Sequence, residues 1–471
     1  MALGNTLEKF FEPETVAVVG ASSTPGKAGN DILLNILAND YAGSLYLVNP
    51  KGGEILGRRV YPSIRNLPDG IDLAVIILPA RANPQALRDC AAKGIRAVVL
   101  VAGGFAEVDG EGEILQGKMA AVIRETGIRV LGPNTSGLLS IPHNLAASFF
   151  PLGRVPRGGI SYMAQTGNFA THTMRYIMSA ENFGVARVAG LGNKVDVDES
   201  EVLEYLGDDP ETRAILVYLE SFKRPKRFVE IARRVTRHKP VILLKGGSTE
   251  RGAEAALTHT AALASDDRIL TGALAQAGVV RIWKYSHLFL VPKGLASMPL
   301  PEGRRVGFLA PSGAMAVCLT DLCAGELDLR VPDLEEFSRK RLQEISPPFI
   351  KIRNPVDIWP AATVRGIAFA YREGIETLMS DAHIDAVVAI LMLTEETGIP
   401  PLDFLVEVSR RHPERPLYVS CSGEKRQMEA AKAFLEPRRV PVFLLPEEAF
   451  EVLGVLARCR EAMKGEKDHG G

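Results

Sequence analysis

The sequence is poor in the features that mark several classes of protein. It has five cysteines among 471 residues, and their positions fit neither the paired spacing of a metal site nor that of a disulfide framework. No apolar run approaches the 18 residues of a membrane-spanning helix, and the first residues lack the basic and apolar segments of a secretion signal. We therefore expect no metal, no membrane association and a reducing cytoplasm as the place of action.

An excess of charge of one sign is also missing. The 55 Lys and Arg residues against 56 Asp and Glu residues give a net charge of −1. Such a chain has no overall field to recruit nucleic acid, so any polyanionic ligand must be held by local groups. The hydrophobic share of 46% and the charged share of 24% are typical of a globular protein with sizeable cores, and the length predicts about three domains.

Short apolar strands alternate with helical stretches from one end of the chain to the other. Because these strands are apolar on both faces, they predict parallel sheets covered by helices, and so three doubly wound α/β domains. The predicted strands are Val16–Gly20, Leu45–Asn49, Leu73–Leu78, Ala97–Val101, Ile128–Leu131, Gly159–Met163, Val185–Ala189, Ala214–Leu219, Val241–Lys245, Arg305–Ala310, Ala386–Leu391 and Leu417–Ser420.

Proline-containing stretches predict the domain boundaries. They lie near Pro142–Pro156 and at Pro292–Glu302, which predicts domains over 1–145, 146–295 and 296–463, with a disordered tail over 464–471. The second and third domains pair as copies of one design: GGISYMAQTGNFATHTM corresponds to RVGFLAPSGAMAVCLTD. The third domain lacks a histidine after its last paired strand, so we expect any chemistry in the second.

One histidine stands where phosphoryl chemistry could use it. His259 lies between two threonines, after the buried strand VILLKGG and the turn-forming Gly246, Gly247 and Gly252, and ahead of a small-residue run that predicts a helix. A neutral imidazole on such a loop can attack a phosphoryl group and hold it as a phosphoramidate. A structural or solvated histidine is the alternative.

The first domain opens with a strand, a glycine-bearing turn and a helix, a geometry that points backbone N–H groups at an anion. The turn has neither the P-loop spacing nor G-x-G-x-x-G. The next strand ends in Asn49-Pro50-Lys51 instead of the acidic residue usual in an NAD site. Lys51 suits a phosphate on the adenosine, which coenzyme A carries at its 3′ position and NADP at its 2′ position; a solvated surface lysine is the other reading.

The second domain offers two further elements, a place for an anion and a carboxylate. Gln165, Thr166 and Gly167 open the helix after strand Gly159–Met163, where Thr166 can cap the helix and the first-turn N–H groups favour a phosphate. Glu220 ends a buried strand, at the edge where open α/β proteins bind ligands, and could fix the tautomer of His259. A plain structural cap and a solvated loop glutamate are the alternatives.

Together these segments resemble the α subunit of NDP-forming acyl-CoA synthetases, the ADP-forming acetate–CoA ligase type related to succinyl-CoA synthetase. The resemblance runs over about residues 6–460 and is carried by FFEPETVAVVGASSTPGKAGNDILLN, LYLVNPKGGEILGRRVYPSI, DLAVIILPA, VLGPNTSGLL, ISYMAQTGNFA, LGNKVDVDESEVLEYLGDDPETRAILVYLES, GAEAALTHTAALASDD and NPVDIW. It implies an N-terminal Rossmann-like CoA-binding domain followed by two flavodoxin-like domains.

The resemblance also implies a three-step relay. Phosphate opens an acyl-CoA to give acyl phosphate and CoA, the phosphoryl group passes to His259, and the histidine segment carries it to ADP. Glu220 corresponds to the carboxylate that orients the phosphohistidine, and Gln165, Thr166 and Gly167 to the helix start that holds phosphate. The implied CoA-binding residues are Gly20, Ser22, Lys27, Asn49, Pro50, Lys51, Pro79 and Asn134.

The chain departs from the family pattern around the histidine. Ala261 and Ser265 replace two glycines, and the phosphate-binding motif reads Ala164-Gln165-Thr166-Gly167. Ala261 predicts a stiffer segment. None of the three domains shows a nucleotide-phosphate loop, so the resemblance implies an ATP-grasp β subunit that binds Mg-ADP or Mg-ATP. The alternatives are a non-catalytic CoA-binding regulatory subunit, a protein acyltransferase scaffold and an NADP-dependent reductase.

Overall fold

The computed structural model describes residues 4–165, 173–260, 267–396 and 401–465, with the backbone alone at 4–6 and 256–260. The chain forms two compact units, residues 1–285 and 286–471. Unit 1 holds two sheets and unit 2 holds one. Among the described residues, no helix combines the length and the apolar character that a membrane crossing requires.

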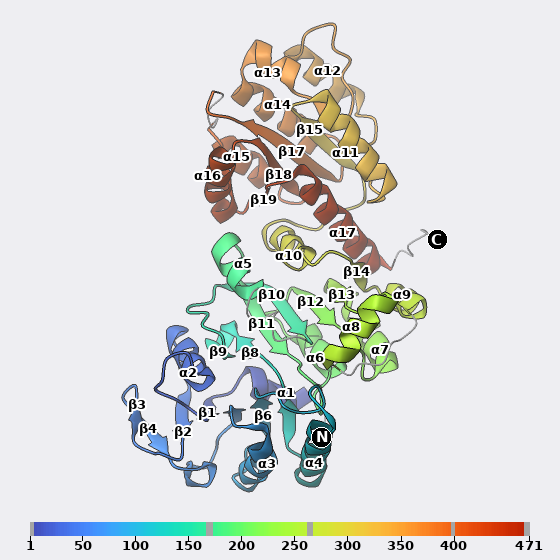
Figure 1. The fold of residues 1–471 in the computed structure, drawn as a ribbon. Coiled ribbons are helices and arrows are strands. Elements are labelled where there is room, and N and C mark those ends of the chain that lie inside the picture. Colours follow the sequence, from blue (N-terminus) through green and yellow to red (C-terminus); the bar gives the residue numbers. More distant parts are fainter. Residues whose placement is uncertain (1–3, 166–172, 261–266, 397–400, 466–471) are drawn as a thin grey trace. The chain divides into compact units, whose positions relative to one another are not determined.

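The first sheet of unit 1 has the order β3-β4-β2-β1-β5-β6-β7. Its strands are β1 Thr15–Val19, β2 Ser44–Val48, β3 Glu54–Ile55, β4 Arg58–Tyr61, β5 Leu73–Ile76, β6 Ala97–Leu100 and β7 Arg129–Leu131. The helices of this part are α1 Gly4–Phe11, α2 Ala28–Ala38, η1 Ile64–Asn66, η2 Ala80–Ala82, α3 Asn83–Ala92 and α4 Gly110–Thr126. Helices α3 and α4 cover one face, and α1 and α2 pack on the other (Figure 1).

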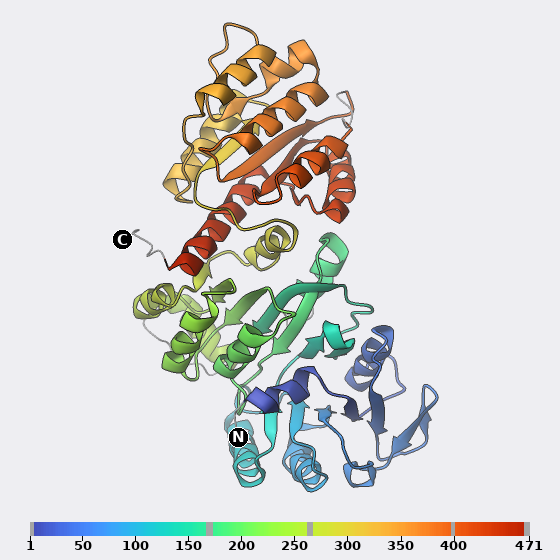
Figure 2. The same ribbon diagram turned by 180° about the vertical axis from the view of Figure 1, so that it is seen from behind.

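The second sheet has the order β14-β13-β12-β10-β11-β8-β9. Its strands are β8 Gly137–Ser140, β9 Leu145–Ser148, β10 Arg157–Ala164, β11 Val185–Gly190, β12 Ala214–Leu219, β13 Val241–Lys245 and β14 Val280–Ile282. The connecting helices are η3 Ile141–His143, α5 Met174–Ala180, α6 Glu199–Asp208, α7 Pro225–Val235, α8 Glu250–Thr260 and α9 Asp267–Gln276. One hydrophobic core runs from α1 and the first sheet into this second sheet. Figure 2 shows the two sheets of unit 1 as neighbours.

The sheet of unit 2 has the order β16-β15-β17-β18-β19. Its strands are β15 Val306–Ala310, β16 Val356–Asp357, β17 Ala386–Leu393, β18 Leu417–Gly423 and β19 Val442–Phe443. The helices are α10 His287–Ser297, α11 Gly313–Gly325, α12 Glu336–Ile345, α13 Trp359–Arg365, α14 Ile367–Ser380, α15 Asp403–Arg411, α16 Lys425–Leu435, η5 Glu436–Arg438 and α17 Pro446–Lys464.

The predicted α/β fold class is confirmed, and every predicted strand is present within three residues of its predicted ends. Strands β14-β13-β12-β10-β11 match β19-β18-β17-β15-β16 in order, as the pairing of the second and third domains predicts. The second sheet is not purely parallel, however. Strands β8 and β9, whose residues the predicted boundary at 145 divides, form its antiparallel edge through β11.

The predicted break at Pro292–Glu302 was placed on part of a helix. Pro292 lies inside α10, where it is buried, and α10 packs on α17 within unit 2. The apolar residues LFLV that precede the proline extend the helix through it, because their burial outweighs the loss of one backbone hydrogen bond. The predicted tail begins at Lys464, which is the last residue of α17; residues 466–471 lie outside the described part.

A buried guanidinium joins α1 to the second sheet of unit 1. The Arg187 side chain is 1% exposed and contacts both carboxylate oxygens of Asp209 at 3.2 Å, and it donates to Glu12 Oε1 at 3.0 Å and to the Phe11 carbonyl oxygen at 3.1 Å. The Tyr205 hydroxyl donates to the same Glu12 oxygen at 2.9 Å, and its ring stacks on Phe11 at 4.7 Å. Removal of the cation would leave two carboxylates without their shared partner.

We expect Arg187→Met to destabilise unit 1 by about 3–5 kcal/mol, because breaking a buried ion pair leaves an uncompensated buried charge. The measurement is the free energy of unfolding from urea titration. Arg65→Met is the control, because Arg65 pairs with Asp89 at an exposed site, and it should cost less than about 1 kcal/mol. Equal costs for the two variants would contradict a stabilising role for the Arg187 network.

Candidate functional site

The turns after β1 and β2 are tied together by one amide side chain. Asn49 Nδ2 donates to the Ala21 carbonyl oxygen at 2.9 Å, and Asn49 Oδ1 accepts from the Lys51 backbone N–H at 3.0 Å. The Gly20 N–H donates to the Val48 carbonyl oxygen at 2.9 Å. The two segments predicted from the sequence to bind CoA therefore form one surface at the carboxyl edge of the first sheet, where Lys51 is exposed.

The remaining residues of this surface lie around the start of α2. Lys27 is the N-cap residue of α2 and is exposed, and the Ser22 hydroxyl oxygen accepts from the Thr24 N–H at 3.1 Å. Asn30 Nδ2 donates to the Ser22 carbonyl oxygen at 3.1 Å, which holds this turn against the helix. The first-turn N–H groups of a helix lack intrahelical partners, so this end of α2 suits an anion. Pro50, next to Lys51, is exposed.

Pro79 and Asn134 lie at the same edge of the first sheet. Pro79 follows β5 and is the N-cap residue of η2, and Asn134 follows β7 in a left-handed conformation with φ +58°. Asn134 is exposed, and its Nδ2 donates to Asn193 Oδ1 at 3.3 Å. Asn193 belongs to the turn after β11, so this edge is continuous with the second sheet.

The carboxyl edge of the second sheet brings Gln165 and Glu220 together. Gln165 Oε1 accepts from the backbone N–H groups of Glu220 at 3.1 Å and Ser221 at 3.0 Å, and from the Lys194 ammonium at 3.2 Å. Three donors around one atom identify it as the oxygen of the amide. This oxygen therefore faces the end of β12, and the turn of Ser221 is fixed by it.

The carboxylate of Glu220 has a second support. The Tyr218 hydroxyl donates to Glu220 Oε1 at 3.0 Å, and Glu220 is 8% exposed. A Cβ atom at Gly246, the residue that follows the neighbouring β13, would lie 2.9 Å from the Tyr218 hydroxyl oxygen and 3.2 Å from Glu220 Cγ. Gly246 is therefore needed for space, because only a residue without a side chain lets the tyrosine and the glutamate meet over the strand.

Two buried lysines lie at this edge, and neither was predicted from the sequence as a site residue. Burial lowers the pKa of the Lys194 ammonium below its ordinary value, against the opposing effect of Glu199 at 3.0 Å. Burial also lowers the pKa of Lys245, which ends β13, against the opposing charges of Asp267 and Glu220. Lys194 lies in LGNKVDVD, part of a segment that carries the family resemblance. That was the signal by which sequence reasoning could have found this lysine.

The other predicted residues of the phosphoryl site fall partly outside the described residues. Thr166 and Gly167 lie outside them. The backbone of His259 belongs to α8, so it is not on a loop as the sequence predicted, and its side chain is not described. Gly252 does not form a turn ahead of the helix, as the sequence predicted, but is the third residue of α8, where its N–H donates to the capping Thr249 hydroxyl at 3.0 Å.

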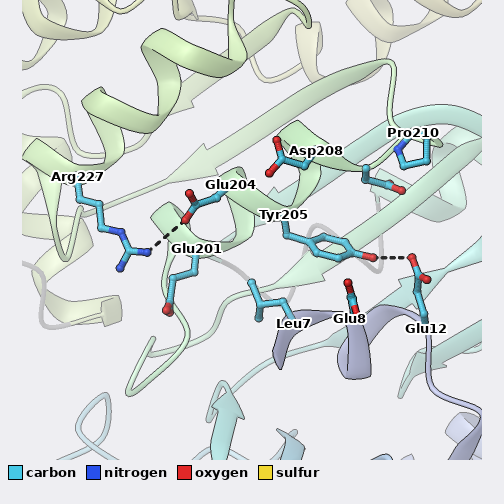
Figure 3. Close-up of a pocket in the computed structure, with 10 residues that line it drawn as sticks. Leu7, Glu8, Glu12, Glu201, Glu204, Tyr205, Asp208, Pro210 and Arg227 are labelled. Atoms are coloured by element: carbon cyan, nitrogen blue, oxygen red, sulfur yellow. Dashed lines mark hydrogen bonds and ion pairs between the residues drawn. The ribbon is translucent and has the colours of Figure 1, made fainter. Parts of the chain in front are cut away.

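A separate pocket of about 250 Å³ lies between α1 and α6 (Figure 3). Six of its ten lining residues are acidic, Arg227 pairs there with Glu204 at 3.3 Å, and none of the predicted site residues lines it. A wall of carboxylates repels anions, so this pocket does not suit phosphate or CoA. Within the described ranges, no three His, Cys, Asp or Glu side chains are placed to share a metal ion.

Two family models match the parts of unit 1 just described. A CoA binding domain matches residues 14–140, and a succinyl-CoA ligase like flavodoxin domain matches residues 157–295. The first match covers the surface around Asn49, and the second covers the edge around Glu220. The predicted order, a CoA-binding domain followed by a flavodoxin-like domain, is thereby confirmed.

Similar proteins extend the match over nearly the whole chain. The ADP-forming acetate–CoA ligase I subunit alpha of Pyrococcus furiosus is 35% identical over 96% of this chain and 97% of its own length. The ADP-forming acetate–CoA ligase II of Archaeoglobus fulgidus is 33% identical over 96% of this chain and 67% of its own. The acetyl-coenzyme A synthetase 1 of Ca. Korarchaeum cryptofilum, solved with phosphate and ADP, has a TM-score of 0.90 at 31% identity over 98% of both chains. The chain therefore belongs to the family of ADP-forming acetate–CoA ligase α subunits, within the succinyl-CoA synthetase superfamily.

Proposed function

We propose that the chain is the α subunit of an NDP-forming acyl-CoA synthetase, which interconverts acyl-CoA, phosphate and ADP with the acid, CoA and ATP through a phosphohistidine on His259. The observation that carries this proposal is the support of Glu220. Two backbone N–H groups at the end of β12 bind Gln165, and the Tyr218 hydroxyl binds the carboxylate itself. A carboxylate held in one place can orient an imidazole, as the acid of a catalytic triad does.

The proposed reaction has three steps. A phosphate oxygen attacks the thioester carbon, the C–S bond breaks, and CoA leaves as a thiolate that takes up a proton. An imidazole nitrogen of His259 then attacks the phosphorus of the acyl phosphate, and the bond from phosphorus to the acyl oxygen breaks to release the carboxylate. A terminal oxygen of ADP finally takes the phosphoryl group and restores the imidazole.

We assign the CoA surface to the edge tied together by Asn49, with Gly20, Ser22, Lys27, Pro50, Lys51, Pro79 and Asn134 around the ligand. CoA supplies the thiol that carries the acyl group. Lys51 and Lys27 are exposed cations on this surface, and the N-terminal end of α2 adds a partial positive charge. In this proposal Lys51 contacts the 3′-phosphate, and the α2 end faces the pyrophosphate.

The partner in this proposal is an ATP-grasp β subunit that binds Mg-ADP or Mg-ATP, and the assembly acts in the cytoplasm. The relative of Pyrococcus furiosus is named as a subunit alpha, which supports a second subunit. Gln165, Thr166 and Gly167 are proposed to hold the phosphate beside Glu220. The domain ranges 1–145, 146–295 and 296–463 are proposed to carry CoA binding, phosphoryl transfer and the second flavodoxin-like fold.

The assignment of Lys51 predicts discrimination between CoA and dephospho-CoA. Isothermal calorimetry should show CoA binding about 10-fold more tightly than dephospho-CoA, because a charge-assisted hydrogen bond contributes roughly 1.5 kcal/mol. Lys51→Ala should abolish this preference, while Lys340→Ala, at an exposed pair in unit 2, should retain it. Tighter binding of NADP than of CoA would support the reductase alternative.

The relay predicts phosphorylation of His259. The wild-type chain in complex with its ATP-grasp partner should take up label from ³²P-acetyl phosphate, and the label should be labile in acid and stable in alkali. His259→Asn should take up no label. Glu220→Gln should take it up about 10- to 100-fold more slowly, because the imidazole loses its orienting charge. Label that persists in His259→Asn would contradict the proposal, and CoA binding without any label would favour a CoA-binding regulatory subunit.

Because a side chain at Gly246 would meet Tyr218 and Glu220, one added methyl group at this position should slow labelling of His259. Gly246→Ala should separate Tyr218 from Glu220 and slow labelling of His259 by about 10- to 100-fold, with CoA affinity unchanged. Gly272→Ala in α9 is the matched control, because its added Cβ meets open space, and its labelling should equal that of the wild type. The measurement is the single-turnover rate; a wild-type rate in Gly246→Ala would show that the pair is not needed.

A further inference from the structure

The turn that follows β11 runs along the end of the first sheet. The Asn193 N–H donates to the Pro133 carbonyl oxygen at 2.9 Å, and the Val195 N–H donates to the Gly132 carbonyl oxygen at 3.1 Å. A Cβ atom at Gly192 would lie only 2.0 Å from the Pro133 carbonyl oxygen, so the two backbones touch. The turn is therefore fixed to the first sheet while its strand belongs to the second.

Asn193 places its side chain on the side of the proposed CoA surface. Its Nδ2 donates to Glu107 Oε2 at 2.5 Å and to Gln116 Oε1 at 3.0 Å, and its Oδ1 accepts from Asn134 at 3.3 Å. Glu107 in turn accepts from the Gly104 N–H at 2.6 Å. The amide of Asn193 thus orders the loop after β6 and the side chain of Asn134.

Lys194 directs its side chain to the other site. It is 4% exposed, and its ammonium donates to the Ser221 carbonyl oxygen at 2.7 Å and to Gln165 Oε1 at 3.2 Å, with Glu199 at 3.0 Å. The backbone of Lys194 has φ +55°, a left-handed conformation that non-glycine residues seldom adopt. Such conformations persist where surrounding contacts determine them, and they cluster at functional sites.

Lys194 acts on Glu220 through Gln165. The same Gln165 oxygen that accepts from the ammonium also accepts from the N–H groups of Glu220 and Ser221. The ammonium fixes the amide, and the amide fixes the backbone from which the Glu220 carboxylate projects. Loss of the ammonium would remove the charged donor to Gln165 Oε1 and leave the amide held by the two backbone N–H groups and by its Nε2 bond to the Ser221 hydroxyl at 3.0 Å, so the amide and its backbone donors would be less firmly fixed.

We propose that Asn193 and Lys194 are a pair of positioning residues, one for the CoA surface and one for Glu220, so that a single turn sets the two halves of the active site against each other. This inference rests on the proposed function, because it assigns Glu220 the task of orienting His259. Neither residue touches the reacting atoms. Each acts through a neighbour: Asn134 and Glu107 for the first, Gln165 for the second.

The test of Lys194 uses Lys194→Met/Glu199→Gln in complex with the ATP-grasp partner, since the double change removes both buried charges together. Labelling of His259 from acetyl phosphate should slow by about 10- to 100-fold, whereas the Kd for CoA should stay within about 2-fold of wild type. Hydrogen exchange at the Glu220 and Ser221 amides should accelerate, a readout that does not depend on activity.

Asn193→Ala should weaken CoA binding and leave labelling unchanged, which is the opposite of the result expected for the Lys194 variant. Its Kd for CoA should rise by about 10-fold, because the loop after β6 loses its anchor, while labelling from acetyl phosphate stays within about 2-fold. If the two residues only stabilise the fold, the affinity for CoA and the rate of labelling should both fall, together with thermal stability, in both variants. That result would overturn the proposal. Wild-type labelling and wild-type amide exchange in the Lys194 variant would overturn it too.

The two proposals fail in different ways. If the wild-type complex takes up no label, the phosphohistidine function fails, and amide exchange with CoA calorimetry still decides whether Asn193 and Lys194 position the two surfaces. If the wild type is labelled normally and the variants behave like it in every readout, the positioning role alone is wrong.

Discussion

The backbone contact between residues 132–133 and the turn after β11 is the constraint on which unit 1 depends. Two hydrogen bonds join these segments, and the distance at Gly192 leaves no room for a side chain. Parallel α/β sheets bind ligands at their carboxyl edges, so two sheets whose carboxyl edges meet can present one continuous site. The contact holds the carboxyl edges of the two sheets next to each other, so the fold itself sets the distance between them.

Buried charge gives this junction its specificity. Lys194 and Glu199 form a buried pair, and Arg187 with Asp209 forms another in the same unit. Such pairs contribute little net stability compared with apolar residues, but removal of one partner is strongly destabilising. An ammonium that needs three acceptors at once therefore selects one arrangement of Gln165 and Ser221, which is what a site with a fixed carboxylate requires.

Much of this arrangement could be predicted from the sequence, and the reason is the same for each correct element. The inner strands are apolar on both faces, so their pattern does not depend on what surrounds them. Short strands such as β3, β8 and β9 were missed, because a run of two to four residues carries too little of that pattern. Gly252 was assigned to a turn because glycine favours turns, but the hydroxyl of Thr249 three residues earlier accepts from its N–H at the start of the helix that contains it.

Lys194 and Tyr218 show what sequence patterns leave out. Lys194 meets Gln165, which follows a different strand, and Tyr218 meets Glu220 two residues further along the chain, where Gly246 leaves space for the pair. No spacing along the chain encodes the first meeting, since Gln165 and Lys194 are separated by a whole strand and helix. The two-residue spacing of Tyr218 and Glu220 puts them on one face but does not by itself predict a hydrogen bond. Gln165 and Glu220 could be predicted because each directly follows a buried strand.

Comparison with the third sheet shows which residues of the second sheet the fold itself does not need. Its strands repeat the order of the second sheet, and the ladder between β17 and β18 ends at Leu393 and Gly423, as that between β12 and β13 ends at Leu219 and Lys245. The residue after Leu393 is Thr394, where the second sheet has Glu220 after Leu219. The duplicated ladder thus keeps its apolar strands and lacks both charges. Since the fold forms without that carboxylate and that lysine in unit 2, folding alone does not account for them in unit 1, in agreement with the phosphoryl site that we propose at this edge.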